Sequence, residues 1–457
     1  MKKMSLKLQK IGTGRIIAMC LVMLTIATSC KKKTDDPEPD PDPTGTTITV
    51  SGNITTNTTW TAVNKYVLSG FVYVKDGATL TIEPGTIIKG EKTTKGTLII
   101  ERGGKIMAQG TATNPIVFTS DQPAGSRNYG DWGGIILCGK ATINVSGGEA
   151  EIEGGVGSIY GGGSSPVDND NSGVLSYVRI EFPGIPFATD KEINGLTCGG
   201  VGSGTTIDHI QVSFSGDDSY EWFGGKVNAK YLIAFRGWDD DFDTDYGYQG
   251  MIQYGISLRD PNIADMSGSN SFESDNDGSG SSNLPQTKPI FSNISVFGPK
   301  VDASTNVASN FKRVMHLRRN SSISIFNSVF TAWPTGLFID GTASQTNATN
   351  DELRIENCRI AGMSTFFASD FERTYFMTAS RHNDTLATNT SLMITDPYNL
   401  SSPNFKPQAG SPVLNAALFT NSYLSNSFFT TETFIGAMGA TDWTLNWTNF
   451  DPQNTAY

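Results

Sequence analysis

The most constraining feature of this sequence is a repeat of about 21 residues in the middle of the chain. Within residues 207–247, Gly216 recurs as Gly237, and each of two strand-like segments ends in an acidic turn. A strand, a turn, a short second strand and a glycine, repeated at this period, are typical of a solenoid. One coil cannot bury its apolar face alone, so neighbouring coils must stack. We therefore expect Asp218 to lie close to the next acidic pair, at 239–240.

The same pattern extends towards the N-terminus. Apolar triplets at 98–100, 116–118 and 135–137 follow one another at similar steps, with Gly, Asn and Pro between them. The apolar runs are often continuous, as expected for strands covered on both faces, whereas a sandwich strand alternates and a propeller repeat is about twice as long. No 12-residue window between 48 and 400 has a convincing helical period. The predicted fold class is all-β: a right-handed, single-stranded parallel β-helix with N- and C-terminal caps.

Composition divides the chain into four segments. Residues 1–29 combine a basic start with an apolar run too short to span a bilayer, which indicates a signal peptide. The segment ending at Cys30 resembles a bacterial lipobox, which implies cleavage before Cys30 and acylation of its thiol; the alternative is an ordinary signal peptide. Residues 30–47 alternate Pro with Asp and Glu and form an extended tether. The β-helix occupies 48–400, and the Phe- and Trp-rich segment 401–457 is predicted to cap its open end.

Charge and cysteine content exclude several classes of function. After removal of the signal peptide the chain has 29 Lys and Arg against 45 Asp and Glu, a formal charge of −16. Nucleic-acid binding requires a basic surface and is therefore excluded. Cys138, Cys198 and Cys358 are widely spaced and odd in number, which argues against a disulfide framework or a thiolate metal site.

Longer stretches of sequence resemble known families. Residues 70–120, which include DGATLTIEPGTIIKG and GTLIIERGGKIMAQGTATNPIVFTS, resemble the opening coils of pectin-lyase-like right-handed β-helix proteins. The phrases DWGGIILCGKATIN, DDDFDTDYG and DWTLNWTNFDPQNTAY resemble a group of Bacteroidetes outer-membrane lipoproteins with that fold. The pair Asp35 and Asp36 resembles the acidic export signal of such lipoproteins. The resemblance implies a lipid-anchored protein on the outer membrane that faces the extracellular side, and it implies no particular activity.

Eleven carboxylates are expected along one edge of the β-helix. They are Asp217, Asp218, Glu221, Asp239, Asp240, Asp241, Asp243, Asp245, Glu273, Asp275 and Asp277. Neighbouring coils lie about 4.8 Å apart, and two carboxylates at roughly 5 Å repel by about 3 kcal/mol at an effective dielectric near 20. A hard cation would relieve this repulsion. Ca²⁺ suits best because it accepts about six to eight oxygens in loose geometry. The alternative is a solvated acidic ridge whose aspartates form turns.

Aromatic and basic side chains near these acids are candidate ligand contacts. They are Trp222, Trp238, Tyr246, His316 and Arg318. Exposed rings beside carboxylates would stack on sugars, whereas buried rings would pack the core. Alternation along a strand places His316 and Arg318 on one face. These two side chains either hold an anionic glycan or pair with the acidic loop at 273–277, and we favour the pairing.

Three functions remain open. We expect a non-catalytic binding or accessory lipoprotein, with a polysaccharide or an outer-membrane importer as its partner and no catalytic residue. The first alternative is a Ca²⁺-dependent polysaccharide lyase or glycoside hydrolase. The segment 207–209 followed by Asp217 resembles one coil of pectate lyases, but their arginine–proline–arginine motif is missing. The second alternative is a structural or adhesive surface rod. An enzyme would place Arg, Lys or a carboxylate pair opposite the acidic edge, a binding module would expose rings alone, and a rod would do neither.

Overall fold

A computed structural model describes residues 45–188 and 191–457. The predicted signal peptide, Cys30 and residues 31–44 of the tether lie outside the described residues. Among the helices of the described part, none is long and apolar enough to cross a membrane.

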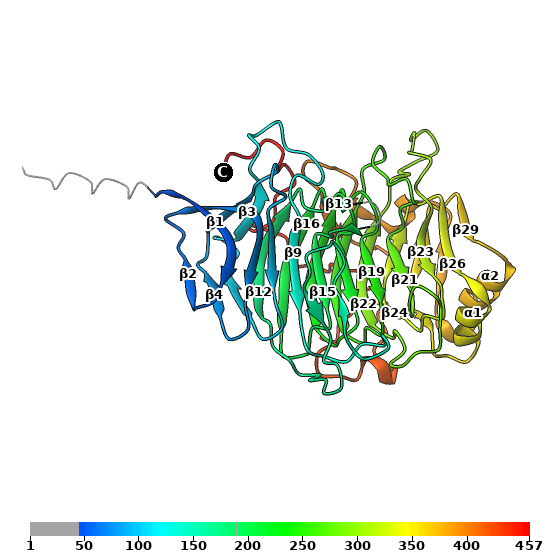
Figure 1. The fold of residues 1–457 in the computed structure, drawn as a ribbon. Coiled ribbons are helices and arrows are strands. Elements are labelled where there is room, and N and C mark those ends of the chain that lie inside the picture. Colours follow the sequence, from blue (N-terminus) through cyan, green and yellow to red (C-terminus); the bar gives the residue numbers. More distant parts are fainter. Residues whose placement is uncertain (1–44, 189–190) are drawn as a thin grey trace, which may run out of the picture. The chain divides into compact units, whose positions relative to one another are not determined.

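The described chain is a parallel β-helix with three faces, which we call faces A, B and C (Figure 1). Face A contains β6 (Thr97–Ile100), β9 (Gly134–Cys138), β15 (Leu196–Gly199), β17 (Tyr220–Phe223), β19 (Phe242–Asp245), β21 (Phe272–Ser274), β23 (Arg313–Leu317), β26 (Thr335–Ile339) and β29 (Thr365–Phe367). Face B contains β2 (Thr58–Trp60), β4 (Thr79–Ile82), β7 (Lys105–Gln109), β24 (Ser324–Phe326) and β27 (Arg354–Glu356). Face C contains β5 (Ile87–Gly90), β8 (Ile116–Ser120), β25 (Val329–Thr331), β28 (Arg359–Ala361) and β30 (Asp384–Leu386).

Longer strands run through a bend and contribute to two faces. β12 (Gly173–Glu181), β16 (Thr206–Ser213), β18 (Asn228–Phe235), β20 (Met251–Leu258) and β22 (Ile290–Phe297) join faces B and C, and β1 (Thr47–Ile54) and β3 (Lys65–Val74) join faces C and A. Outside these faces lie three two-stranded pairs, two α-helices and three short 3₁₀ turns. Their bounds are β10 (Ala150–Glu151), β11 (Ile159–Tyr160), β13 (Pro186–Ala188), β14 (Lys191–Glu192), β31 (Ile394–Asp396), β32 (Asn404–Pro407), α1 (Gly341–Thr349), α2 (Asp370–Phe376), η1 (Ala379–Arg381), η2 (Asn389–Leu392) and η3 (Ser422–Leu424).

A column of stacked rings marks the bend between faces B and C. Tyr177, His209, Tyr231 and Tyr254 occupy this position in successive coils, and each has a positive φ, between 50° and 66°. Residues other than glycine rarely adopt this backbone conformation. Their ring centroids are 4.2, 4.2 and 4.7 Å apart in that order. Stacking between coils therefore offsets the backbone strain of the bend.

The register of the middle coils confirms the predicted stacking. β17 pairs with β19 so that Tyr220 faces Phe242, and β19 pairs with β21 so that Phe242 faces Phe272. These rings fill the interior with centroids 5.7 and 5.1 Å apart. The prediction that 207–247 forms adjacent coils is therefore correct, and the all-β, parallel β-helix class is confirmed.

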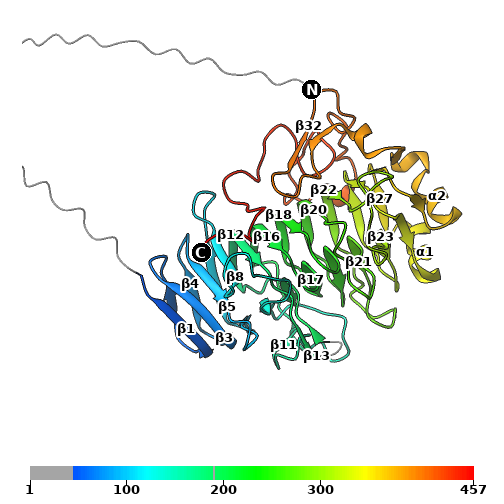
Figure 2. The same ribbon diagram turned by 90° about the horizontal axis from the view of Figure 1, so that it is seen from above.

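The C-terminal segment does not cap the open end in the way the sequence suggested. It runs back along the flank of the β-helix, where Gln253 bonds Thr430 and Arg127 bonds Pro452. Figure 2 shows this segment lying beside earlier strands, while Figure 1 shows α1 and α2 at the far end. Its Trp443 and Trp447 pack against the ring column at His209. Aromatic content predicts that a segment covers part of the β-helix, but it does not say whether that part is a flank or an open end.

Candidate metal-binding cleft

A cleft of about 350 Å³ lies on face A, beside the turns that lead into β17, β19 and β21. Nine acidic and three basic side chains line it. The acidic residues are Glu153, Glu192, Asp217, Asp218, Glu221, Asp239, Asp240, Asp243 and Glu273, and the basic ones are Lys312, Arg313 and Arg318. The acids therefore outnumber the bases threefold within one small volume.

The turns repeat a short spacing that positions these acids. Asp218 precedes Glu221 by three residues, as Asp240 precedes Asp243 and Asn270 precedes Glu273. Because β17, β19 and β21 pair in register, equivalent residues of successive coils lie side by side. The turn acids form one row and the strand acids a second row.

Backbone hydrogen bonds hold the first row in place. The amide of Asp218 donates to Asn194 Oδ1 at 3.2 Å, and the amide of Asp240 donates to Asp218 Oδ1 at 2.8 Å. The amide of Asn270 in turn donates to Asp240 Oδ1. One oxygen of each aspartate is thus committed to the next coil. The fold itself fixes the spacing of the row.

The second row lies on the strands of face A. Glu221, Asp243, Glu273 and His316 face one another in consecutive register positions. Their strand neighbours, such as Tyr220 and Phe242, are fully buried in the interior. Alternation along each strand therefore directs one side chain into the core and the next into the cleft.

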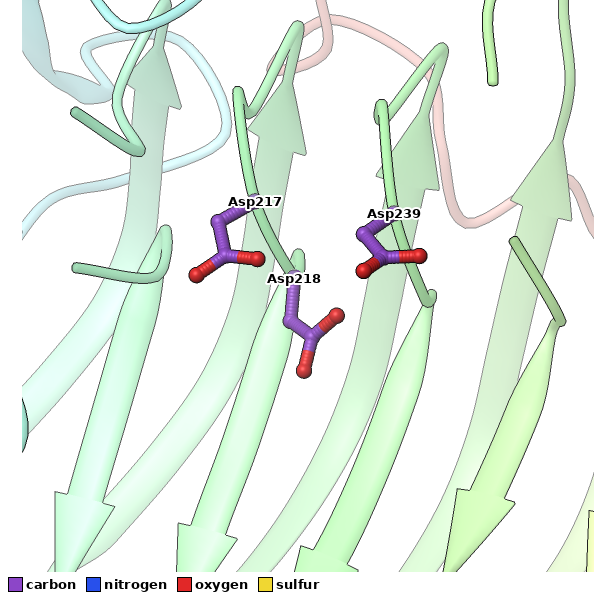
Figure 3. A group of neighbouring side chains, drawn as sticks. All are labelled: Asp217, Asp218 and Asp239. Atoms are coloured by element: carbon purple, nitrogen blue, oxygen red, sulfur yellow. The ribbon is translucent and has the colours of Figure 1, made fainter. Parts of the chain in front are cut away.

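Three groups of carboxylates come close enough to share a cation, with one oxygen from each member within 4.8 Å of the others. The first triad is Asp217, Asp218 and Asp239, the middle triad is Asp218, Glu221 and Asp243, and the last triad is Asp240, Asp243 and Glu273. Figure 3 shows the first triad, with the carboxylates of two adjacent turns side by side. Within the described residues, the members of the first and middle triads form no salt bridge.

This crowding raises the proton affinity of the cleft. Burial, followed by the charges of neighbouring carboxylates, raises the pKa of Asp218, Asp240 and Asp243 well above the usual range. The same two causes act on Glu221, and they raise the pKa of Asp239 to about 7. Burial disfavours the charged form of a carboxyl, and each charged neighbour disfavours it further. The cleft is therefore poised to take up protons or a cation.

A basic wall faces the carboxylates from the next coil. Lys312 and Arg313 begin this wall, and the side chain of Lys312 lies across Gly268. A Cβ at Gly268 would approach Lys312 Cε to 2.8 Å, and the φ of +114° is itself unsuited to other residues. Lys312 Nζ donates to the carbonyl of Ser309 at 3.3 Å. Glycine at this turn thus allows a lysine to lie at the rim of the cleft.

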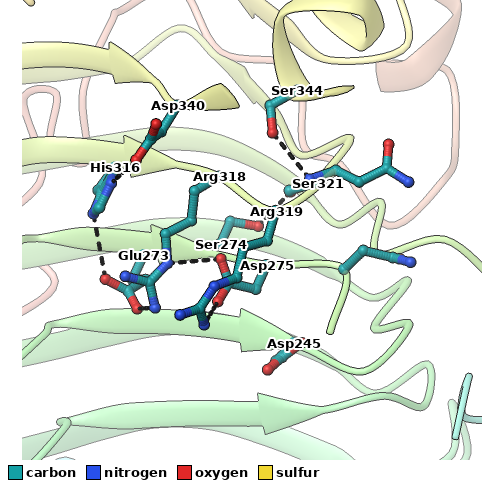
Figure 4. A network of polar contacts seen from close by, with 12 residues as sticks. Asp245, Glu273, Ser274, Asp275, His316, Arg318, Arg319, Ser321, Asp340 and Ser344 are labelled. Atoms are coloured by element: carbon teal, nitrogen blue, oxygen red, sulfur yellow. Dashed lines mark hydrogen bonds and ion pairs between the residues drawn. The ribbon is translucent and has the colours of Figure 1, made fainter. Parts of the chain in front are cut away.

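The remaining basic side chains pair with the acidic loop, as we favoured. Arg318 contacts Glu273 and donates to Asp275 Oδ1 at 2.8 Å, and Arg319 donates to Asp275 Oδ2 at 2.7 Å (Figure 4). His316 lies 3.1 Å from Asp340 and 3.5 Å from Glu273. Arg318 and His316 also line the cleft, so both belong to its boundary.

Several predicted site residues lie elsewhere. Asp241 is fully buried and pairs with the equally buried Arg259 at 2.8 Å, so the prediction that it is a cleft ligand is wrong. Trp222 is 1% exposed in the core, which contradicts its predicted ligand contact. Asp277 accepts from Ser279 and Ser281 of its own loop and does not line the cleft.

Four further predicted residues do not line the cleft. Asp245 follows Asp243 at the end of β19, and Asp275 follows Glu273 just after β21. Trp238 is exposed and packs edge-on against Tyr129. Tyr246 lines a separate, more apolar cleft of about 430 Å³, which shares Glu153 with the acidic one. The ring of Tyr246 is thus placed to meet a ligand that extends out of the acidic cleft.

Among the residues of the cleft that were not predicted as site residues are Asn194, Asn270, Glu153 and Glu192. The two asparagines could have been found by aligning the coils on their strands. Asn270 stands three residues before Glu273, and Asn194 stands three residues before Thr197, which pairs with Glu221. Glu153 and Glu192 reach the cleft from a loop and a hairpin outside the repeat, where no spacing signal exists.

The residues present fit a hard divalent cation. The candidate ligands in the three triads are all carboxylate oxygens, which Ca²⁺ prefers. Two further observations favour a cation: Asn270 Oδ1 and Asp243 Oδ1 are buried in the cleft and have no hydrogen-bond partner among the described residues. Buried acceptors without donors are costly. No thiolate or imidazole contributes to these triads, which disfavours softer metals.

A match to a known protein family agrees with this architecture. A family model described as "Pectate-lyase like beta helix domain" matches residues 52–396. Among solved structures, the crystal structure of pectate lyase Pel9A is similar at 13% identity and a TM-score of 0.33, over 80% of this chain and 88% of that chain. None of the curated proteins compared with the sequence matches it. The family match spans most of the chain, and the predicted resemblance to pectin-lyase-like β-helices is confirmed at this level. The chain belongs to the family of pectate-lyase-like β-helix domains.

Proposed function

We propose that this protein is a cell-surface lipoprotein whose acidic cleft binds Ca²⁺ and, with it, an acidic polysaccharide. The observation that carries the proposal is the set of three carboxylate triads in one cleft. The residues of the first and middle triads form no salt bridge within the described chain. Asp217, Asp218 and Asp239 would hold the ion. When bound, Ca²⁺ would attract the carboxylates of a uronic-acid polymer, which the cleft by itself repels.

The protein's own residues contribute to both ends of the glycan site. Lys312 and Arg313 lie at the basic wall, where they attract an anionic chain. Tyr246, which is only partly buried, lines the adjoining apolar cleft, where a sugar ring would stack on its aromatic face. A glycan can therefore extend from a charged region to an aromatic one. A purely structural rod would need neither.

Binding of polygalacturonate tests this proposal. We expect the purified protein to bind polygalacturonate in millimolar Ca²⁺ and to release it in chelator, as measured by affinity electrophoresis. Asp217→Asn with Asp239→Asn should abolish binding, and uncharged dextran should not bind in either condition. Equal retention by polygalacturonate with and without Ca²⁺, or no retention by any uronic-acid polymer, would contradict the proposal.

A second candidate function is polysaccharide lyase activity, which the basic wall favours. An enzyme was expected to place Lys or Arg opposite the acidic edge, and Lys312 and Arg313 occupy that position. In a β-elimination, Lys312 would take the proton next to the uronate carboxyl, and that electron pair would form the new double bond. The glycosidic C–O bond would break, and its oxygen would take a proton from solvent.

Product formation separates the two candidates. A lyase releases unsaturated uronates, which absorb in the ultraviolet. Lys312→Ala should remove this absorbance and weaken, but not abolish, Ca²⁺-dependent binding, whereas Lys300→Ala, outside the acidic cleft, should change neither the absorbance nor the binding. If polygalacturonate is bound but never cleaved over a wide pH range, the protein is a binding module.

Membrane attachment is a separate part of the proposal and depends on Cys30. The lipobox-like segment supports acylation, and the acidic tether supports display on the outer face of the outer membrane, beside a polysaccharide or an importer. Cys30→Ala should abolish sedimentation with outer membranes. Unchanged membrane fractionation of that variant would contradict the lipoprotein assignment.

A further inference from the structure

The three triads of the cleft cannot all be occupied by separate cations, because the middle triad shares residues with the other two. The first and last triads share no residue, whereas the middle triad takes Asp218 from the first and Asp243 from the last. Two cations could therefore each receive a complete set of three carboxylates. Glu221 would lie between them, as the one member of the middle triad that belongs to neither of the others.

The buried side-chain amide of Asn270 lies beside the last triad, and its oxygen has no hydrogen-bond partner in the described chain. Asn270 is 2% exposed, and its Nδ2 lies 3.3 Å from Asp240 Oδ2 and 3.2 Å from Glu273 Oε2. Its Oδ1, in contrast, has no hydrogen-bond partner within the described chain. An amide oxygen is an ordinary Ca²⁺ ligand. Rotation of this amide by half a turn would direct its oxygen towards the two carboxylates, where a cation would hold it.

The neighbouring arginine does not fill the last triad. Arg318 contacts Glu273 through Oε1, whereas the contact of Glu273 with Asn270 uses Oε2. Asp243 Oδ1 is buried and has no hydrogen-bond partner in the described residues. Arg318 therefore orients one ligand from outside and leaves oxygens of Asp240, Asp243 and Glu273 facing one another.

We propose that the cleft holds two Ca²⁺ ions, one in the first triad and one in the last triad with Asn270 Oδ1 as an additional ligand. This inference rests on the proposed Ca²⁺ site and extends it. The two ions would lie roughly one coil spacing apart, near 5 Å, as adjacent register positions require.

Charge in the cleft also favours two ions over one. The lining side chains carry nine formal negative charges and three positive ones, a balance of −6. One Ca²⁺ reduces this balance to −4, which lessens the repulsion of a polyanion. A second Ca²⁺ reduces it to −2, which lessens that repulsion further. Binding of an acidic glycan is therefore easier to reconcile with two ions.

Calcium stoichiometry measured by native mass spectrometry and by calorimetric titration tests the inference. We expect two ions per wild-type chain. Glu273→Gln and Asp217→Asn should each retain one ion, and Asn270→Ala should weaken only one of the two binding steps by about tenfold or more. Asp277→Asn is the matched control, because that carboxylate lies outside the cleft, and it should retain two ions. Melting curves of each variant confirm that it is folded before ions are counted.

Each outcome decides the inference. A wild-type chain that binds one ion overturns it, and so does a Glu273→Gln variant that still binds two. If one ion binds and polygalacturonate retention still requires Ca²⁺, the two-ion inference fails while the proposed function stands. If two ions bind and no uronic-acid polymer is retained, the inference stands and the proposed glycan function fails.

Discussion

Adjacent aspartates of the same turn differ sharply in their surroundings. Asp241 is fully buried, and Arg259, also fully buried, donates to it at 2.8 Å while Ser257 donates to its other oxygen. Asp240 is 4% exposed, and its contacts are the amide and side chain of Asn270, with no salt bridge in the described chain. The same residue type is therefore neutralised in the core and left without a counter-ion in the cleft. The fold supplies a basic side chain to the carboxylate in the core and none to the carboxylate in the cleft.

The largest expected effect comes from breaking the paired region. Arg259→Met should lower the free energy of unfolding by about 3–5 kcal/mol, because it leaves Asp241 buried and uncompensated. Urea denaturation measures this loss. The double variant Arg259→Met, Asp241→Leu should recover much of it, since no charge then remains in the core. A single variant as stable as the wild type would show that the pair contributes nothing.

The cleft should respond to Ca²⁺ where the paired region does not. A ligand that binds only the native state, at a hundredfold excess over its Kd, stabilises it by about 2.7 kcal/mol. The protein should therefore melt a few degrees higher in Ca²⁺ than in chelator. Asp239→Asn with Asp240→Asn should abolish this difference and slightly raise the melting temperature in chelator, because repulsion falls. Equal melting of the wild type in both conditions would reduce the cleft to a solvated acidic ridge.

Stability in chelator and the stabilisation by Ca²⁺ should change in opposite directions as the pH rises. Burial and then Asp265 raise the pKa of Asp239 to about 7 in the folded protein, against about 4 for an unfolded aspartate. Its stabilising contribution is therefore complete below about pH 4 and is lost as the pH rises through about 7. In chelator, thermal stability should fall between about pH 4 and pH 7. In Ca²⁺ the stabilisation should grow over the same range, since ligand carboxylates must be deprotonated.

Asp239→Asn is the control for this dependence. In chelator, the thermal stability of the variant should decrease less with rising pH than that of the wild type, because the amide does not titrate in this range. A wild-type protein whose stability in chelator rises with pH would contradict the sign.

The sequence was sufficient for the fold and for half of the cleft. Repeated glycines and apolar runs specify stacked coils, and a repeated acidic turn places Asp218 against Asp240 without any structural knowledge. Side-chain direction was harder to predict. Asp241 stands next to two cleft acids, yet its partner Arg259 lies 18 residues away on the far side of a strand. Asn270 was missed because a loop lengthens its coil, so that it follows Asp240 by 30 residues instead of 22.

The smallest expected effect concerns Asp277, which the sequence placed among the metal ligands. Its Oδ1 accepts from the amide and hydroxyl of Ser279 and from the amide of Ser281, at 2.9, 2.7 and 3.0 Å, and its Oδ2 accepts from the Ser281 hydroxyl. In Asp277→Asn the amide oxygen keeps the first three bonds and loses the fourth. Thermal denaturation should therefore show a loss of about 0.5–1.5 kcal/mol, typical of one hydrogen bond. The Ca²⁺-dependent increase in melting temperature should be unchanged, because this carboxylate is committed to its own loop. A variant that loses half or more of that increase would place Asp277 in the ion site and make the contrast between paired and unpaired carboxylates less sharp than the structure indicates.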